Sequence, residues 1–138
     1  MKSLIVNAKN FGVEFDSLAN RPKEIFHEEV NGKEKQECTD CVVVFITVEE
    51  GDGIKAVDGI VSEIIKTCKD VNRNKAVIVP FAHLSNNLAK PKQGFEIIKE
   101  IESKLKETVE SFSAHFGSNK SLLLEIYGHT GNCRFREF

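Results

Sequence analysis

Residues 75–91 read KAVIVPFAHLSNNLAKP, and this stretch decides how the rest of the chain is arranged. Residues 76–79 form a short, unbroken apolar run rich in β-branched side chains, which is typical of a strand buried on both faces. Pro80 ends this strand because it has no N–H to donate to a sheet. His83 and a polar run follow directly. A buried strand that leads into a histidine-bearing loop is a common way to build a small-ligand site, so we expect a site there.

The flanking sequence predicts an α/β (α+β) domain, with a mixed sheet and two main helices packed on it. Apolar residues recur at steps of three and four in the two expected helices, residues 54–71 and 93–108. The expected strands, besides 76–79, are residues 3–6, 11–15, 41–48, 110–116 and 120–127, with an extended stretch or short strand at 25–30. Residues 7–10 are expected to form a hairpin turn, and residues 128–138 show no clear period.

Composition indicates one globular domain over residues 1–138, with 41% hydrophobic residues. The formal net charge is −2, so no general electrostatic attraction toward nucleic acid is expected. Apolar runs are too short for a signal peptide or a membrane span, which leads us to expect a cytoplasmic protein with no membrane partner. Without a secretory signal, the four cysteines are expected to be reduced thiols.

Two side chains are candidates for chemistry. His83 follows the buried strand, and Lys120 opens a later strand directly after a turn. Loop histidines often only cap a turn, and lysines at strand ends are usually solvated, so neither residue is decisive alone. Ser85 lies too close to His83 on an irregular loop for a nucleophile–base pair, and no Gly-rich phosphate loop is present. The acidic pairs at residues 28–29 and 49–50 are predicted to be solvated loop charges.

Cys38 and Cys41 form a single C-x-x-C motif. A structural zinc site needs four ligands, so distant residues would have to complete one here. Cys68 falls on the apolar face of the first predicted helix and is interpreted as a core residue. A zinc site and a redox pair or disulfide stay open for the motif, but ordinary loop cysteines carry the most weight. We predict no metal site.

The block at residues 79–91, VPFAHLSNNLAKP, resembles the N-terminal editing domain of archaeal threonyl-tRNA synthetases. Residues 1–6 (MKSLIV), residues 44–49 (VFITVE) and the closing segment at 116–129 agree with that family in order and spacing. The resemblance spans nearly the whole chain. It implies a D-aminoacyl-tRNA deacylase-like fold, a homodimer, and a place as the N-terminal part of a longer chain with catalytic and anticodon-binding domains in cis.

The resemblance also implies an activity, the hydrolysis of the ester in mischarged L-seryl-tRNA(Thr). Serine is threonine without one methyl group, and such a difference is worth only about 1–3 kcal/mol in a pocket, so a second, hydrolytic site is needed for accuracy. In the family, an ordered water and the 2′-OH of the terminal ribose are thought to do the chemistry, without a covalent side-chain nucleophile. No cofactor is implied for this domain.

Carried over to this sequence, the resemblance gives catalytic roles to Lys120 and His83. Lys120 would bind the substrate and help to place the attacking water, while His83 would hold the terminal adenosine or the ester. Arg134 and Arg136 are further candidates for contact with RNA phosphate. The implied substrate-binding residues are Pro80, Phe81, Ala82, Val48 and Asn119.

Three positions depart from the family pattern. Asn119 stands where many members have an aromatic residue, residues 7–10 (NAKN) replace a His-Ser-Asp type of sequence, and residues 130–134 (TGNCR) lack an acid. The nearest acid along the chain after that segment is Glu137. These departures leave three alternatives open: a general D-aminoacyl-tRNA deacylase, a non-catalytic tRNA-binding or dimerisation module, and a small-molecule regulatory domain.

Overall fold

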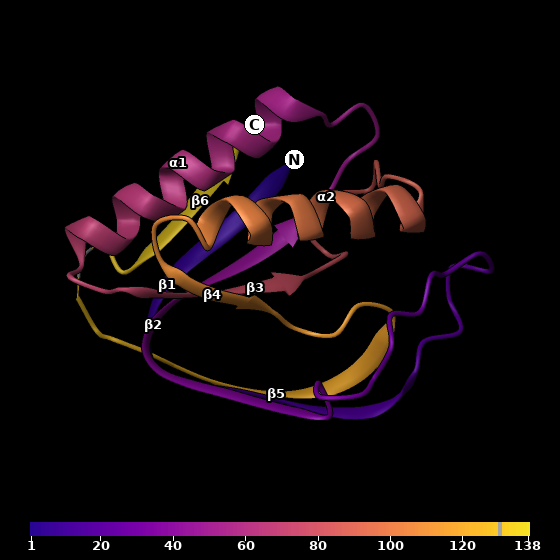
Figure 1. The fold of residues 1–138 in the computed structure, drawn as a ribbon, viewed down its shortest axis with the longest axis horizontal. Coiled ribbons are helices and arrows are strands. Elements are labelled where there is room, and N and C mark those ends of the chain that lie inside the picture. Colours follow the sequence, from indigo (N-terminus) through magenta and orange to yellow (C-terminus); the bar gives the residue numbers. More distant parts are fainter. Residues whose placement is uncertain (130) are drawn as a thin grey trace.

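The computed structural model describes residues 1–129 and 131–138, so Thr130 of the 130–134 departure lies outside the described residues. It shows a six-stranded mixed sheet and two helices, which confirms the predicted fold class (Figure 1). The elements in chain order are β1 (Lys2–Leu18), β2 (Lys35–Thr47), α1 (Ile54–Asp70), β3 (Lys75–Pro80), α2 (Pro91–Leu105), β4 (Glu110–Ser113), β5 (Ser118–Ile126) and β6 (Cys133–Glu137). The strand order is β4-β3-β2-β1-β5, and β6 also pairs with β1.

The first strand is the main departure from the sequence prediction. Residues 2–18 form one continuous strand instead of a hairpin with a turn at 7–10, and that prediction is wrong. Asn7, Ala8 and Asn10 all have partners on β2. A register shift against β5 between Ala8 and Asn10 is all that remains of the expected turn. Because β1 pairs with β2 on one edge and with β5 and β6 on the other, these hydrogen bonds outweigh the turn preference of Asn7 and Asn10.

Two other local predictions also differ from the structure. Residues 25–30 have no strand partner, so the short strand considered there is absent from the described fold. The segment without a clear period contains β6, which pairs with the first part of β1, for example through Phe135 opposite Leu4. Most side chains of β6 are exposed or half-buried, and charged residues alternate along it, so it lacks the apolar run that would have revealed it.

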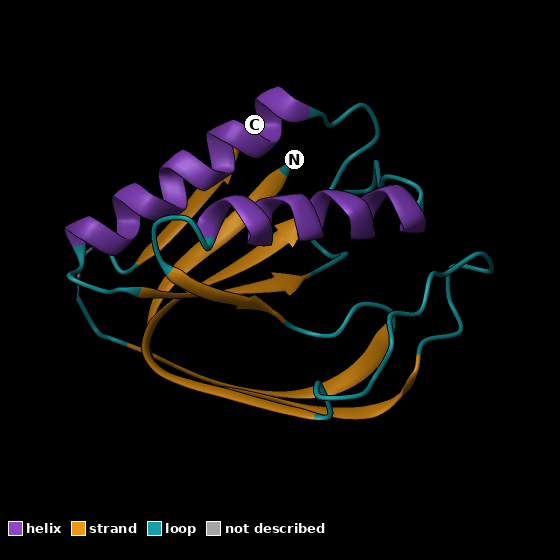
Figure 2. Cartoon of the chain, in the orientation of Figure 1, coloured by secondary structure: helices purple, strands orange, loops and turns teal. Residues whose placement is uncertain are grey.

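The sheet is covered by both helices on one face, and it bends strongly (Figure 2). The far parts of β1 and β2 curve beneath the first layer and, with β5, form a ribbon under it (Figure 1). One hydrophobic core lies between helices and sheet, and it includes Cys68 as predicted. A second core, around Phe11, Val43 and Phe45, lies on the other face of the sheet. The bend brings the ends of distant strands close together.

The cysteines of the C-x-x-C motif lie on β2, so they are strand residues and not loop residues. All four thiols are free, and Cys41 is buried. Burial raises the pKa of Cys41, and burial raises that of Cys68 to about 11. In the part of the chain that the structure describes, no group of three or more His, Cys, Asp or Glu side chains is arranged to hold a metal ion. No described helix is long and apolar enough to cross a membrane.

A buried carboxylate joins α2 to β4, and it makes stability depend on pH. Burial alone would raise the pKa of Glu102, but hydrogen bonds from Lys106, Lys99 and Ser113 outweigh it and lower the pKa to about 2. Because the folded pKa lies below the unfolded one, the stabilisation is complete above the ordinary glutamate range and is lost as pH falls toward 2.

We therefore expect the wild-type protein to lose about 2 kcal/mol of unfolding free energy from this carboxyl group between pH 5 and pH 2. Urea unfolding of the wild type and Glu102→Gln at several pH values measures this effect. The substituted protein should be less stable at neutral pH and should show a smaller acid-induced loss. Parallel pH profiles for the two proteins would contradict the assignment.

Candidate functional site

A cavity of about 540 Å³ opens at the carboxyl ends of β2 and β3. Its walls come from these two strand ends, the loop after β1, part of α2, and the start of β5. β2 and β3 are parallel neighbours, so their carboxyl ends lie side by side. The structure brings together all seven residues singled out from the sequence, which are Val48, Pro80, Phe81, Ala82, His83, Asn119 and Lys120. Their roles in substrate binding and catalysis stay predictions.

The loop that carries His83 is pinned to the end of β2. The N–H of Phe81 donates to the carbonyl of Ile46 at 2.9 Å, and the Thr47 hydroxyl donates to the carbonyl of Phe81. The same hydroxyl accepts a hydrogen bond from the N–H of Leu84 at 3.3 Å. Ala82 and His83 lie between these anchors and are exposed, and their N–H groups donate to no described residue. Two fixed backbone donors are therefore available to a ligand.

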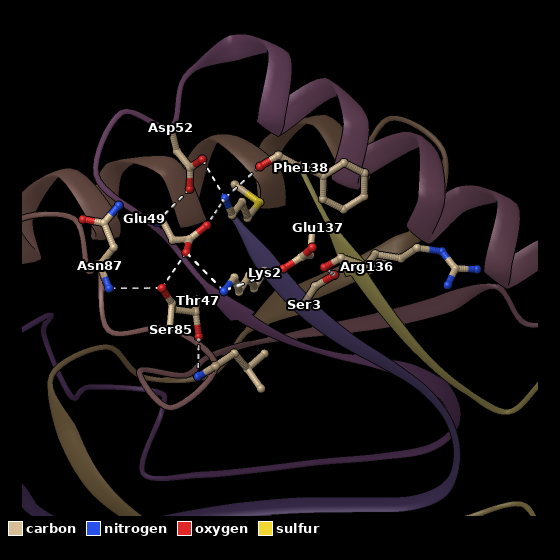
Figure 3. A network of polar contacts seen from close by, with 12 residues as sticks. Lys2, Ser3, Thr47, Glu49, Asp52, Ser85, Asn87, Arg136, Glu137 and Phe138 are labelled. Carbon is tan, nitrogen blue, oxygen red and sulfur yellow. Dashed lines mark hydrogen bonds and ion pairs between the residues drawn. The ribbon is translucent and has the colours of Figure 1, made fainter.

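A polar network of residues outside the cavity lining also holds this loop (Figure 3). The hydroxyl of Ser85 donates to Glu49, whose other carboxylate oxygen accepts from the α-amino group of Met1 at 2.8 Å. That amino group also donates to Asp52 at 2.7 Å and to the carbonyl of Phe138 at 2.9 Å. Hydrogen bonds from the amino group and from Ser85 lower the pKa of Glu49 against the opposing effect of burial. The prediction that Glu49 is a solvated loop charge is thus wrong.

Lys120 lies at the start of β5 with its side chain half-buried, not solvated. Its Nζ donates to the carbonyl of Ser118 at 3.1 Å. Desolvation lowers the pKa of Lys120, and the carboxylate of Glu28 acts in the opposite direction. No Asp or Glu is among the described residues that line the cavity, whereas Lys120, His83 and Arg21 are. A site with this charge pattern favours a ligand that is anionic or that becomes anionic during a reaction.

The loop after β1 also lines the cavity, through Ala19, Arg21, Pro22 and Ile25, and none of these residues was predicted from the sequence. Ala19 is tied to the start of β5 because its N–H donates to the carbonyl of Gly117 at 2.9 Å. Further along the loop, Phe26 stacks on Phe95 of α2, with 4.6 Å between ring centroids, and also contacts Phe116. Phe26 is an apolar residue within a polar stretch, and this was the sequence signal that could have indicated a packed loop.

Glu28 connects this loop to β5, and its predicted solvated state is also wrong. Its carboxylate accepts from the N–H of Phe116 at 3.0 Å and pairs with Lys33 at 2.9 Å. The buried His115 ring contacts the Glu28 carbonyl at 2.7 Å. Glu137, the acid considered from the sequence, lies on β6 beside Lys2 and does not line the cavity. Glu28 is therefore the carboxylate that influences Lys120.

Arg134 and Arg136, considered as RNA contacts, are engaged within the protein. Arg134 pairs with Asp70 and Arg136 with Glu63, each at 3.0 Å. Neither arginine lines the cavity.

Fold and cavity together define a mixed α+β domain whose carboxylate-free pocket is built on the ends of two parallel strands. Comparison of the sequence with known families gives the class a name. The chain belongs to the family described as the archaea-specific editing domain of threonyl-tRNA synthetase, whose model matches residues 1–137. The resemblance inferred from residues 79–91 is thus confirmed.

Individual relatives agree with this assignment. The threonine–tRNA ligase of Staphylothermus marinus is 37% identical over 132 residues, which cover 94% of this chain and 21% of the relative. That of Methanococcus vannielii is 35% identical, with 94% and 20% covered. The threonine–tRNA ligase editing subunit of Saccharolobus solfataricus is 36% identical, with 67% and 24% covered. The chain thus spans about a fifth of the length of the ligases that it matches.

One solved structure has the same fold. The structure of "c-Myc DNA Unwinding Element Binding Protein" covers 100% of this chain and 99% of its own, with a TM-score of 0.69. Its sequence is only 12% identical, so the likeness concerns the fold alone.

Proposed function

We propose that this domain hydrolyses the ester of L-seryl-tRNA(Thr) and so removes serine from mischarged tRNA. The observation that carries the proposal is the cavity itself, which holds a half-buried lysine, a histidine and two free backbone N–H groups, and no carboxylate among its described lining residues. Membership of the editing-domain family supports the reaction class.

In the proposed reaction, a water attacks the ester carbonyl and negative charge develops on the carbonyl oxygen. The Lys120 ammonium group, held partly out of water, stabilises this charge more strongly than it would in bulk solvent. Ser85 is not proposed as a nucleophile, because it is not among the described residues that line the cavity. The 2′-OH of the terminal ribose orients the water. The tetrahedral intermediate then breaks the ester C–O bond, the ribose oxygen leaves with the proton that the water gives up, and serine is released without acylation of a protein side chain.

The free N–H groups of Ala82 and His83 serve to hold the seryl group and the terminal adenosine. Phe81 fixes the His83 ring by an edge contact, with 4.8 Å between ring centroids, and itself contacts Phe45 at 5.3 Å. Val48 forms an apolar wall of the cavity. A wall of this kind, fixed by the end of β2, discriminates by size between serine and threonine.

Deacylation assays with charged tRNA test the proposal. We expect the 138-residue chain to release serine from L-seryl-tRNA(Thr) and to leave L-threonyl-tRNA(Thr) intact. Faster hydrolysis of D-seryl- or D-tyrosyl-tRNA would identify a general D-aminoacyl-tRNA deacylase instead. A chain that retards tRNA in a gel but hydrolyses none of these esters would be a non-catalytic tRNA-binding module. Binding of free serine without any nucleotide would favour a regulatory domain.

The predicted role of His83 is to position the substrate. We expect His83→Ala to raise KM for L-seryl-tRNA(Thr) about tenfold and to lower kcat less, since the loop anchors at Phe81 and Leu84 do not involve the imidazole. Steady-state deacylation with a thermal melt as fold control measures this. His129→Ala, which removes an exposed histidine outside the cavity lining, is the matched control. An unchanged KM would remove His83 from the proposed binding residues.

We also propose a homodimer in the cytoplasm, with the ligase's catalytic and anticodon-binding domains in cis. The outer edge of β5 supports the dimer, because it ends the sheet order and carries exposed apolar side chains at Leu122, Leu123 and Ile126. Light scattering across a concentration series measures the oligomeric state, and a constant monomer mass would refute the dimer.

A further inference from the structure

We propose that Arg21 binds a backbone phosphate of the single-stranded RNA end, at the mouth of the cavity. The inference rests on the proposed function, because it adds a contact for the RNA that carries the ester. The ligand chemistry is a phosphodiester monoanion, which the planar guanidinium fork recognises through paired hydrogen bonds.

Arg21 differs from the other arginines in having no hydrogen-bond or ion-pair partner among the described residues. Arg73 donates to Asn7 and lies near Asp40, while Arg134 and Arg136 are paired with Asp70 and Glu63. Arg21 is exposed and makes no ion pair or hydrogen bond with any described residue. An unpaired arginine on a surface is ordinary, so its place on the molecule must carry the argument.

That place is the rim of the proposed editing cavity. Arg21 lines the same cavity as Lys120 and His83 and belongs to the loop after β1. No carboxylate belongs to the described lining, so the charge of Arg21 is not neutralised there. Two basic side chains, one half-buried and one exposed, thus line a single cavity.

The loop that carries Arg21 is held against the site on both sides of this residue. Before it, Ala19 donates to Gly117 at 2.9 Å and its own carbonyl contacts the His27 ring at 2.7 Å. After it, the N–H of Glu28 donates to the carbonyl of Phe116 at 3.2 Å. A positioned loop lowers the conformational entropy lost when the arginine binds an anion.

The position also fits the chemistry of the substrate. In an aminoacyl-RNA the reactive ester and the phosphate of the terminal nucleotide are separated by a ribose, so one cation cannot contact both. Lys120 is the half-buried cation suited to the reacting ester, and Arg21 is the exposed cation suited to the phosphate. Because the chain carries a net charge of −2, RNA affinity depends on such local contacts.

The test compares two substrates that differ in phosphate. L-Seryl-tRNA(Thr) carries the backbone phosphates, and the serine ester of adenosine has none. For Arg21→Ala we expect KM for the tRNA to rise about tenfold, as for one charge-assisted contact, and at least five times more than KM for the adenosine ester. The logarithmic salt dependence of tRNA binding should become shallower by about 0.7, the value for one phosphate on a single strand.

Lys23→Ala is the matched control, because it removes the same charge from the same loop at a residue outside the cavity lining. It should leave both KM values within twofold. Equal losses on the two substrates, or equal effects of Arg21→Ala and Lys23→Ala, would overturn the phosphate site.

A binding assay separates this inference from the proposed reaction. The wild type, Arg21→Ala and Lys23→Ala are titrated with a fluorescent CCA-ended oligonucleotide that carries its backbone phosphates but no amino acid. Weaker binding by Arg21→Ala alone supports the phosphate site even if no ester is hydrolysed, in which case the proposed function fails by itself. Equal binding by the three proteins, or no binding by any, refutes the site.

Discussion

Replacement of Lys120 by methionine is expected to slow hydrolysis of L-seryl-tRNA(Thr) about 10²–10³-fold, the typical loss when one group that stabilises a developing oxyanion is removed. Methionine fills a similar volume, so the half-buried site on β5 should remain packed. The side chain makes one hydrogen bond, to the carbonyl of Ser118, which limits the expected change in stability. Most of the effect should therefore appear in kcat.

Single-turnover deacylation measures the chemical step directly. Lys9→Met is the matched control, because Lys9 is an exposed lysine of β1 that pairs with Glu125 and does not line the cavity. The pH profile gives a second readout. Desolvation lowers the pKa of Lys120, so the activity that depends on its cation should decline with rising pH at a lower pH than for an ordinary lysine. Wild-type rates in Lys120→Met would exclude this residue from catalysis.

Gly117→Ala is expected to destabilise the fold by about 2–5 kcal/mol. Gly117 has a φ of +86°, in the left-handed region, where a side chain costs about 1–2 kcal/mol. A Cβ atom there would also lie 2.2 Å from the carbonyl oxygen of Phe26, and relieving such overpacking typically costs about 1–3 kcal/mol. Since this contact joins the loop after β1 to β5, the substitution should also open the wall that carries Arg21.

Gly32→Ala separates the two contributions. Its φ is +80°, but no atom lies within 4 Å of the Cβ position, so only the backbone penalty of about 1–2 kcal/mol applies. Urea unfolding of both variants measures the difference, and deacylation should suffer only in Gly117→Ala. Equal destabilisation would mean that the loop moves away from residue 117 without loss.

The strongest periodic signals in the sequence predicted the fold well. The helix expected at residues 54–71 is α1 at Ile54–Asp70. The apolar run at 41–48 covers the carboxyl-terminal half of β2, and the run at 76–79 is the centre of β3. The bent first strand and β6 were missed for a shared reason. Both depend on partners far along the chain, such as Phe135 opposite Leu4, and local propensity does not report such pairing.

The candidate site divides in the same way. A site at His83 was predictable, because this residue follows a buried strand, whereas Val48 and residues 80–82 were assigned from the family resemblance. Glu49 and Arg21 were not predictable. The environment of Glu49 depends on its contact with Met1, 48 residues away. The place of Arg21 at the cavity depends on a loop that is hydrogen-bonded next to β5. Charged residues in polar stretches look alike in sequence, and only tertiary structure tells a bound carboxylate from a solvated one.

The amino group of Met1 has a practical consequence for work with this protein. Its three acceptors, on Glu49, Asp52 and Phe138, suit an ammonium group with three hydrogens (Figure 3). An affinity tag fused ahead of Met1 would convert it into a neutral amide with one hydrogen, and two shielded carboxylates would lose their counter-charge. Glu49 also holds Ser85 in the His83 loop, so a fusion at this position is expected to loosen the loop that lines the cavity.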